Sequence, residues 1–331
     1  MSAPALKSAK RLPPLPTIKD LLKLYGLRAM KHLSQNFLLD MRLTNKIVKT
    51  MGNIAGGQVL EVGSGPGSIT RPIIEKHPAR VVLVEKDKRF LPTLEMLSEA
   101  ASCDVDIILS DILRLNMENM FPEEEVRGWT ERPPNIHLIG NLPFNVATPL
   151  IIRWLKDISL RRSAWRYGRV GLTLTFQKEV AERLSAPILS KQRCRLSLMA
   201  QNWCSVHHVF NIPGKAFLPK PDVDVGVVKL VPLISPVCDY EFHLVEKVCR
   251  VLFSGRQKYI LKTASLLFPL TLRETLAERL LKEANIPPQT RAIQVTLPEV
   301  GRIIKAYNGI ISEQPSLASY NFRNRDDVEV D

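Results

Sequence analysis

Long apolar runs are missing from this 331-residue sequence, and none approaches the ~20 consecutive residues that a membrane-spanning helix requires. We therefore expect no membrane insertion. Cysteine is scarce, with five residues, and no two of them have the two-residue spacing of a zinc ribbon or redox motif. This pattern excludes a disulfide scaffold and favours reduced, packed thiols in a reducing compartment.

Histidine is also too sparse to suggest a metal site. The only adjacent pair, His207 and His208, falls in a predicted strand. Neighbouring side chains on a strand point to opposite faces, so the two rings are not expected to share a ligand.

Acidic residues are outnumbered, with 33 Asp and Glu against 46 Lys and Arg, for a formal net charge of +13. Such an excess favours a polyanionic partner: nucleic acid, an anionic membrane surface or an acidic protein. The excess is uneven, because residues 1–50 hold ten basic residues against two acids and residues 153–193 hold ten against three. Hydrophobic residues make up 45% of the chain, which is enough for a folded core.

The first 19 residues contain four basic residues and no acid. This composition is typical of an organelle transit segment. Three prolines between positions 13 and 16 would break a long amphipathic helix, so a basic arm that contacts RNA is the alternative. We assign residues 1–27 to a basic N-terminal arm and leave both interpretations open.

Strands and helices alternate through the first two thirds of the chain. Apolar, β-branched runs predict strands at 58–62, 80–87, 105–111, 135–140 and 169–176, and helical spacing predicts helices at 68–76, 88–100, 147–158 and 177–184. Residues 116–135, rich in Glu and Pro, are expected to be poorly structured, and residues 207–212 and 224–231 could form an antiparallel pair. The alternation predicts an α/β domain with a parallel sheet, which we place at 28–234.

From about residue 235 the β-branched runs stop. The segments 242–254, 257–268, 272–284 and 297–311 all have helical spacing. We therefore expect a small, all-helical C-terminal domain over 235–331 that ends in a frayed, acidic tail.

Polar residues stand at the ends of four consecutive predicted strands. Glu61 precedes the Gly-rich turn Gly63–Gly67, Glu85 and Asp111 close the next two strands, and Asn141 closes the fourth. In an open α/β sheet, ligands bind beyond the carboxyl ends of the strands. The spacing GxGxG differs from the GxGxxG of pyrophosphate sites, so the set describes a nucleoside. It resembles class I methyltransferases that bind S-adenosyl-L-methionine, with a dinucleotide enzyme as the chief rival.

The stretch IGNLPF, residues 139–144, ends its strand with an amide, a proline and an aromatic ring. It resembles the signature of methyltransferases that act on a planar, amide-like nitrogen such as the adenine amino group. The Asn141 side-chain oxygen and a backbone carbonyl at Leu142 or Pro143 can accept the two amino N–H groups, which turns the nitrogen lone pair toward a methyl donor. Pro143 fixes the direction of that carbonyl, and Phe144 can stack on an unstacked base.

Seven motifs in fixed order make the resemblance specific to the ribosomal RNA adenine N6,N6-dimethyltransferase family, and together with the arm segment RLPPLPTIKDLLKL (11–24) the chain resembles its mitochondrial branch. The seven motifs are LSQNFLLD (33–40), LEVGSGPGSIT (60–70), VEKD (84–87), SDIL (110–113), IGNLPF (139–144), FQKEVAERL (176–184) and AFLPKPDVDVGVVKL (216–230). The resemblance implies a Rossmann-like class I methyltransferase sheet.

The same resemblance implies the site residues. Those expected to bind S-adenosyl-L-methionine are Gln35, Asn36, Leu38, Gly63, Glu85, Lys86, Asp111, Ile112 and Asn141. Within this set Gly63 would contact the methionine end, Glu85 the ribose, and Asp111 with Ile112 the adenine. The expected catalytic residues are Asn141, Leu142, Pro143, Phe144 and Phe217, the last helping to stack the substrate base.

The implied function is dimethylation of two adjacent adenines near the 3′ end of mitochondrial small-subunit rRNA, in the mitochondrial matrix. The implied partners are the 3′-terminal hairpin of that rRNA, the small ribosomal subunit and the mitochondrial transcription machinery, with the protein itself a monomer. Members of this branch are also described as transcription factors, so a non-catalytic nucleic-acid-binding factor on the same scaffold is the rival function.

Three positions depart from the family pattern. Bacterial members usually carry Ser where Val225 stands and Tyr where Phe144 stands, and a Phe keeps the face for stacking while it loses a hydroxyl. The C-terminal basic cluster is thinned here to SGRQK, which concerns RNA affinity. Arg256, Lys258 and Lys262 remain as cations for phosphates.

Overall fold

The computed structural model describes residue 12 and residues 15–30, 33 and 35–323. Within them the chain divides into two compact units. The first extends to Glu182 and includes Ser205–Ile234, and the second combines Arg183–Cys204 with the chain from Ser235 onward.

Residues 183–204 therefore group with the helical unit, although the sequence placed them in the α/β domain. The reason is that two side chains of this segment form hydrogen bonds with residues beyond 235. The Asn202 side chain donates to the Cys238 carbonyl (3.2 Å) and accepts from the Cys238 amide (2.7 Å), and the buried Arg193 guanidinium donates to the Val295 carbonyl (3.0 Å).

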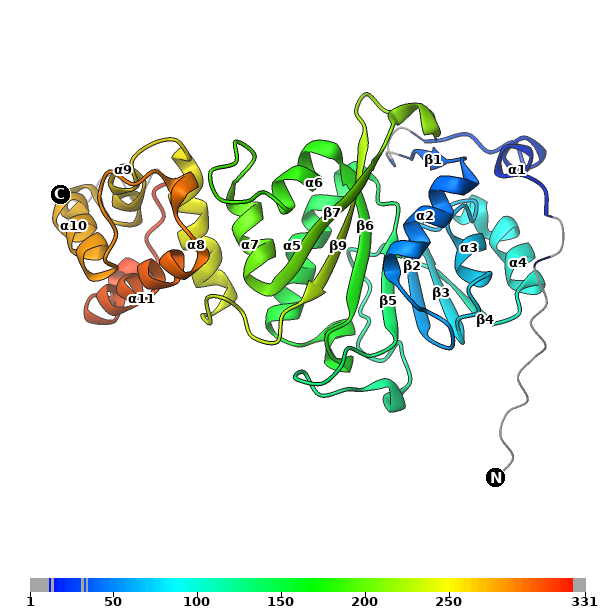
Figure 1. The fold of residues 1–331 in the computed structure, drawn as a ribbon, viewed down its shortest axis with the longest axis horizontal. Coiled ribbons are helices and arrows are strands. Elements are labelled where there is room, and N and C mark those ends of the chain that lie inside the picture. Colours follow the sequence, from blue (N-terminus) through cyan, green and yellow to red (C-terminus); the bar gives the residue numbers. More distant parts are fainter. Residues whose placement is uncertain (1–11, 13–14, 31–32, 34, 324–331) are drawn as a thin grey trace. The chain divides into compact units, whose positions relative to one another are not determined.

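A seven-stranded sheet forms the centre of the first unit (Figure 1). Its order is β4-β3-β2-β5-β6-β9-β7; the first five are parallel and β9 runs antiparallel to β6. The strands are β2 (Gln58–Val62), β3 (Arg80–Glu85), β4 (Asp104–Leu109), β5 (Ile136–Gly140), β6 (Gly171–Gln177), β7 (Cys204–Ile212) and β9 (Val225–Pro232). The predicted pairing partners near the end of this unit are neighbours, with β9 beside β7.

The helices of the first unit flank this sheet (Figure 1). They are α1 (Ile18–Leu24), α2 (Met41–Met51), α3 (Thr70–Ile74), α4 (Leu91–Ala100), α5 (Phe144–Ser159) and α6 (Lys178–Leu184), the last of which crosses the division between the units. The Glu- and Pro-rich stretch 116–135 contains only a three-residue 3-10 helix, as expected from its composition. The alternation of strands and helices gives the predicted α/β fold.

The C-terminal part of the arm predicted at residues 1–27 is folded and belongs to the first unit. Thr17 caps α1 by accepting from the Asp20 amide, and Ile18, Leu21 and Leu22 are buried. These three join the main hydrophobic cluster, because apolar side chains at i, i+3 and i+4 form one helix face. Residues 1–11, where most of the predicted transit or RNA-binding segment falls, lie outside the described residues.

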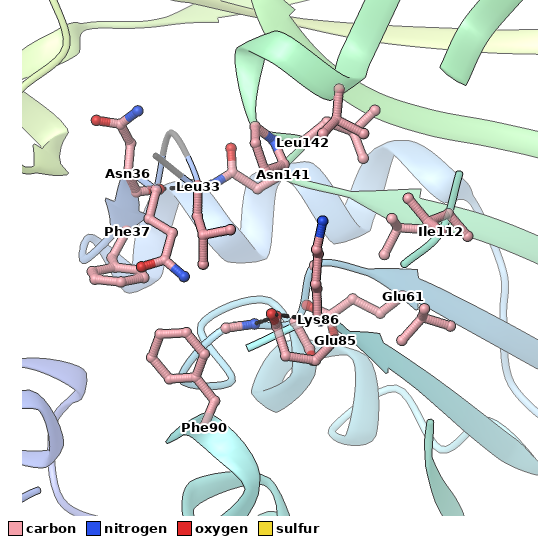
Figure 2. Close-up of a pocket in the computed structure, with 18 of the residues that line it drawn as sticks. Leu33, Asn36, Phe37, Glu61, Glu85, Lys86, Phe90, Ile112, Asn141 and Leu142 are labelled. Carbon is pink, nitrogen blue, oxygen red and sulfur yellow. Dashed lines mark hydrogen bonds between the residues drawn. The ribbon is translucent and has the colours of Figure 1, made fainter. Parts of the chain in front are cut away.

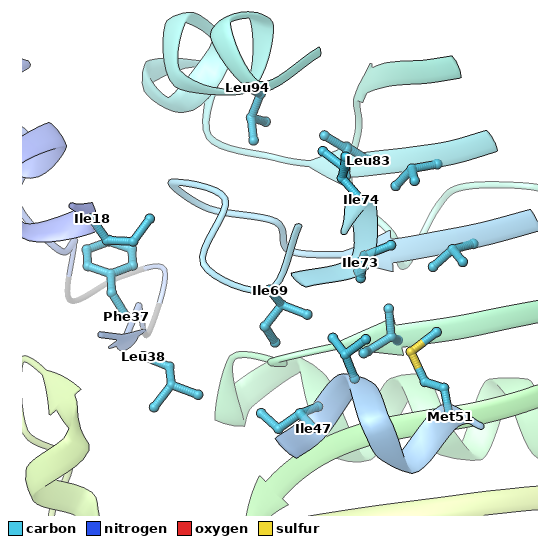
Figure 3. Packing of buried hydrophobic residues seen from close by; sticks show 14 of the residues in the cluster. Ile18, Phe37, Leu38, Ile47, Met51, Ile69, Ile73, Ile74, Leu83 and Leu94 are labelled. Atoms are coloured by element: carbon cyan, nitrogen blue, oxygen red, sulfur yellow. The ribbon is translucent and has the colours of Figure 1, made fainter. Parts of the chain in front are cut away.

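That cluster joins the N-terminal segment to the sheet. Phe37 and Leu38, from the short strand β1 (Phe37–Leu38), pack with Ile47 and Met51 of α2 and with Ile69 (Figure 3). Strand β1 pairs antiparallel with β8 (Phe217–Leu218), far away in the sequence. The pairing fixes residues 37–38 and 217–218 beside the carboxyl ends of the parallel strands.

The second unit is helical, as predicted. Its helices are α7 (Arg195–Trp203), α8 (Phe242–Leu252), α9 (Ile260–Ala264), α10 (Arg273–Glu283) and α11 (Leu297–Glu313). The expected helix at 257–268 is broken: α9 has five residues, and a 3-10 turn follows it.

Several of the cations in residues 153–193 bind other parts of the protein. Arg153 donates to the carbonyls of residues 113 and 115, Arg162 pairs with Asp157 (2.6 Å), and Arg166 pairs with Glu123 (2.6 Å). Arg169 donates to the carbonyls of residues 129, 131 and 232. These guanidinium groups stabilise loops, so the local excess of charge overstates the basic surface offered to a partner.

Within the described part of the chain, no helix is long and apolar enough to cross a membrane. The same residues contain no group of three His, Cys, Asp or Glu arranged to hold a metal ion.

Candidate active site

A cavity of about 160 Å³ opens at the carboxyl ends of the parallel strands. All thirteen site residues named from the sequence line it, and they come from six separate stretches of the first unit. In Figure 2, Asn36 and Asn141 lie on one side of the cavity, and Glu85 and Phe90 on the other. The structure thus brings together every residue of the predicted cofactor and catalytic sets.

The Gly-rich turn after β2 bends the backbone sharply along one wall. Gly63 and Gly65 have φ of 68° and 51°, a region that residues with a Cβ rarely adopt. The Gly63 amide donates to the Val84 carbonyl (2.8 Å), and the Gly65 amide donates to the Glu85 carboxylate (2.8 Å). The turn is therefore fastened to the end of β3.

Glu85 is buried and accepts three backbone hydrogen bonds, from Gly65, Lys86 and Asp87, each at 2.8 Å. Burial raises the pKa of the Glu85 carboxyl, although these bonds favour the charged form. Oε1 accepts the Lys86 and Asp87 amides and Oε2 accepts the Gly65 amide, so one lone pair, on Oε2, remains for a ligand hydroxyl. The side chain is held at the place where the sequence predicted ribose recognition.

A second carboxyl, Glu61, lies one strand away and is also buried. It accepts one hydrogen bond, from the Thr70 hydroxyl (2.6 Å). Burial raises the pKa of Glu61 to about 8, and the neighbouring Glu85 charge acts in the same direction. Near neutral pH this group is mostly protonated and can donate a proton in a hydrogen bond.

Lys86 and Asp111 form an ion pair of 2.9 Å on the cavity wall. The Lys86 ammonium lowers the pKa of the Asp111 carboxyl, so the carboxylate stays charged as a hydrogen-bond acceptor. The Leu113 amide also donates to Asp111 (3.0 Å), and the neighbouring Ile112 is buried. A charged acceptor beside an apolar side chain suits an adenine amino group and ring.

The segment containing Gln35 and Asn36 is bound to the β3 end of the cavity. Gln35 donates to Asp87 (2.8 Å), and the Arg89 guanidinium makes a two-pronged contact with the same carboxylate (2.9 and 2.5 Å). Burial would raise the pKa of Asp87, but the hydrogen bonds from Arg89 and Gln35 lower it. A charged Asp87 therefore fixes this segment along the cavity.

Asn141 sits opposite, at the end of β5. Its amide nitrogen donates to the Asn36 carbonyl (3.1 Å), and its amide oxygen accepts from the Thr175 hydroxyl (2.8 Å). Leu142 is buried, Pro143 precedes the first residue of α5, and Phe144 begins that helix. Phe217, from β8, is buried along the same cavity. The strand thus ends with an oriented amide, as the motif predicts.

The lining also tests whether S-adenosyl-L-methionine fits. The Ser64 and Ser68 hydroxyls are buried on this cavity and have no hydrogen-bond partner among the described residues. A buried hydroxyl without a partner costs about 1–3 kcal/mol, so these groups are suited to a polar ligand. With Glu85 and Asp111 placed for hydroxyl and amino groups, the residues fit the cofactor.

The predicted site set lacks several residues that line the cavity: Leu33, Phe37, Ser64, Ser68, Phe90 and Ser110. It also lacks Thr175, which contacts Asn141 from behind the lining. Phe37 and Phe90 meet edge to face, with ring centroids 5.5 Å apart. Their spacing in the chain gave no signal, since they meet only through the fold. Ser64 and Ser68 lie inside the Gly-rich motif and could have been included as its only hydroxyl-bearing residues besides Thr70.

Comparison with known proteins gives close full-length relatives. The chain is 52% identical over 323 residues to the mitochondrial dimethyladenosine transferase 1 of Macaca fascicularis, covering 98% of this chain and 94% of that protein. It is 51% identical to the human protein of the same name, covering 98% and 93%, and 50% identical to that of Drosophila melanogaster, covering 99% and 98%.

Solved structures share the fold. A dimethyladenosine transferase from Plasmodium falciparum matches with a TM-score of 0.64 at 20% identity, covering 82% of this chain and 96% of that one. The 23S rRNA methyltransferase ErmE matches with a TM-score of 0.57 at 20% identity, covering 82% and 99%. The chain thus has the α/β fold of these two enzymes. The model of the family described as "Ribosomal RNA adenine dimethylase" matches residues 26–298, and the chain belongs to this family.

Proposed function

We propose that the protein is an S-adenosyl-L-methionine-dependent enzyme that dimethylates the amino nitrogen of adenines in ribosomal RNA. The observation that carries the proposal is that Asn141-Leu142-Pro143-Phe144, Glu85 and Asp111 all line one cavity. Family membership and the relatives named dimethyladenosine transferase support the same reaction.

The bound cofactor supplies an electrophilic methyl group on a sulfonium. Glu85 would accept a ribose hydroxyl at its free lone pair, and Asp111, kept charged by Lys86, would accept from the cofactor adenine. These contacts set the position of the methyl group at the strand ends.

The substrate amino nitrogen is a weak nucleophile because its lone pair is delocalised into the ring. The Asn141 oxygen and a backbone carbonyl at Leu142 or Pro143 accept its two N–H groups and direct the lone pair at the methyl carbon. Phe144 and Phe217 supply aromatic faces for the unstacked base. The rate gain comes from positioning and fixed dipoles.

The substrate is rRNA, and more specifically we propose two adjacent adenines in the 3′-terminal hairpin of mitochondrial small-subunit rRNA, each receiving two methyl groups. The protein would act as a monomer on the assembling small subunit. The mitochondrial relatives support a mitochondrial location, and we propose the matrix.

Cations in the second unit offer a place for the RNA backbone. A cavity there is lined by Gln257, Lys258, Tyr259, Lys262 and Arg291, and the Tyr259 side chain is about half exposed, at 48%. Lysine and arginine bind phosphates without reading sequence, and an exposed ring can stack on a base.

The test is a methylation assay with labelled cofactor and an unmethylated small-subunit rRNA transcript. We expect label in dimethyladenosine at two adjacent positions near the 3′ end. The control transcript has both adenines replaced by uracil and should take up no label. Label elsewhere in the RNA, or none in either transcript, would contradict the proposed reaction.

The same preparation addresses the rival function. The intact Asn141 and Glu85 favour an enzyme over a non-catalytic transcription factor. If the protein binds nucleic acid and stimulates transcription but leaves the rRNA unmethylated, the scaffold interpretation replaces this proposal.

The matrix location has a separate test. Deleting residues 2–11 leaves Thr17 and the buried face of α1 in place, so the folded unit should keep its methylation activity. If these residues direct import, the truncated protein should stay outside mitochondria. Import without them would contradict a targeting role, and a large loss of rRNA affinity would indicate an RNA-binding arm.

A further inference from the structure

The amide of Asn141 is held by two contacts from distant parts of the chain. The Thr175 hydroxyl donates to its oxygen at 2.8 Å, and its nitrogen donates to the Asn36 carbonyl at 3.1 Å. The Asn141 oxygen can only accept and the Asn36 carbonyl can only accept, so the two contacts together fix which end of the amide faces each way.

Thr175 belongs to the sheet and not to a loop. Strand β6 pairs parallel with β5, and the last aligned pair is Gly140 with Leu174. Thr175 is therefore the next residue along, beside Asn141. Its side chain is fully buried, and a β-branched side chain on a strand has restricted rotation at χ1. The hydroxyl is thus a rigid donor, fixed in place before any substrate arrives.

The contact limits what the amide can offer to a substrate. An amide oxygen has two lone pairs, and Thr175 uses one of them. One lone pair remains for one N–H of a substrate amino group. The other N–H must be accepted elsewhere on the strand end, at the backbone of Leu142 or Pro143.

Dimethylation uses these two acceptors unequally. Adenine has two N–H groups at its amino nitrogen, so both acceptors hold it during the first transfer. N6-methyladenine has a single N–H, so one acceptor alone must orient the nitrogen during the second transfer. With the Asn141 oxygen as that acceptor, any looseness of the Asn141 amide slows the second transfer more than the first.

We propose that Thr175 is a positioning residue that fixes the Asn141 amide for the second methyl transfer, and so determines that the product is dimethyladenosine. The proposal rests on the proposed function, in which Asn141 contacts the substrate amino group. Thr175 is not among the residues that line the cavity, so it acts through the Asn141 oxygen, while the Asn36 carbonyl holds the amide nitrogen.

The test compares Thr175→Val, which keeps the shape and removes the hydroxyl, with Thr175→Ser, which keeps the hydroxyl. Thr173→Val is the matched control. Thr173 is also buried and lies on the same face of β6, two residues before Thr175, which contacts Asn141. Each variant is given two RNA substrates, one unmethylated and one carrying N6-methyladenine at the target positions. Single-turnover rates and the ratio of monomethyl to dimethyl product are measured.

For Thr175→Val we expect the first transfer to slow by a few-fold and the second by about tenfold or more, so that N6-methyladenine accumulates. Affinity for S-adenosylhomocysteine, measured by calorimetry, should match the parent. Thr175→Ser should restore dimethyl product, and Thr173→Val should behave as the parent does. A merely structural role would slow both transfers equally and would also weaken cofactor binding.

Two outcomes overturn the proposal. The first is a Thr175→Val protein with the parent rates and product ratio, and the second is an equal loss in both transfers. An Asn141→Ala variant, run alongside, separates this failure from that of the proposed function. If Asn141→Ala methylates normally, the assignment of the strand end fails; if it is inactive while Thr175→Val is normal, only the role of Thr175 fails.

Discussion

The two sides of the cavity are built in different ways. On the β3 side, Glu85 is held by backbone: it accepts three amides, two of them from the next two residues. On the side of β5 and β6, Asn141 is held by a side chain 34 residues later and by a carbonyl 105 residues earlier. Glu85 is thus positioned mainly by local structure, whereas Asn141 is positioned by tertiary structure.

This difference separates binding from transfer. If the two sides act independently, a change on the β5 side should alter the rate and leave cofactor affinity intact, and a change on the β3 side should do the reverse. Three sets of variants can break or sharpen that separation, from the largest expected effect to the smallest, and a fourth tests the buried carboxyl Glu61 on the β2 side.

Asn141→Ala should lower methyl transfer by about a hundredfold or more, the scale of one preorganised polar contact to a transition state. Cofactor affinity should change little, because the contacts of Glu85 and Asp111 remain. Single-turnover methylation and calorimetric titration, both on folded protein at fixed salt, check it. Transfer near the parent rate would contradict the separation outright.

Glu85→Ala should weaken S-adenosyl-L-methionine binding by about 1.5–3 kcal/mol, the scale of hydrogen bonds to a charged group. The variant also leaves the Gly65, Lys86 and Asp87 amides without their acceptor, so its thermal midpoint should fall. Calorimetry and thermal unfolding measure the two effects. Glu95→Ala, an exposed change on α4, is the control, and equal affinities of the two variants would remove Glu85 from the ribose site.

Glu61 makes stability depend on pH. Its pKa is raised from the ordinary value of 4.5 to about 8 in the folded protein, so the folded state holds the proton more tightly than the unfolded chain does. The resulting stabilisation is complete below about pH 4.5 and is lost as the pH rises through about 8.

Glu61→Gln removes this titration and keeps an oxygen for the Thr70 hydroxyl. Relative to the variant, the parent should therefore lose about 4 kcal/mol of unfolding free energy between pH 5 and pH 9. Urea unfolding of both proteins across that range provides the measurement. Parallel curves for the two proteins would show that Glu61 is ionised throughout.

Ser64→Ala and Ser68→Ala should have the smallest effects, since each removes one neutral hydrogen bond to the cofactor, about 1 kcal/mol or roughly fivefold in affinity. The Gly-rich turn lies by the expected methionine end, so the loss should appear with S-adenosylhomocysteine and be absent with methylthioadenosine, which lacks the amino-acid group. Calorimetry with both ligands makes the comparison, and Ser110→Ala, near Asp111, is the control. Equal losses with the two ligands would place these hydroxyls elsewhere on the cofactor.

The same contrast explains what the sequence could predict. Glu61, Glu85, Asp111 and Asn141 stand at strand ends, and parallel strands bring such ends to one edge, so the motifs and the α/β fold were sufficient to group them. Thr175 was unpredictable because its contact depends on the register of β5 with β6, which nothing in the strand TLTF indicates.

Two features of the chain's division depend on tertiary contacts. Residues 183–204 join the helical unit through Asn202 and Arg193, whose partners lie beyond residue 235. The end of the predicted arm folds because Ile18, Leu21 and Leu22 form one apolar face that packs in the main hydrophobic cluster.

The internal use of arginines in residues 153–193 has a consequence for measurements in salt. Each cation that neutralises a phosphate releases a counterion, and the slope of log affinity against log salt concentration counts such cations. Arg162 and Arg166 already neutralise carboxylates, and the buried Arg193 donates to a carbonyl. The slope for rRNA binding should therefore be shallower than the ten basic residues of this stretch would suggest if all of them contacted phosphates.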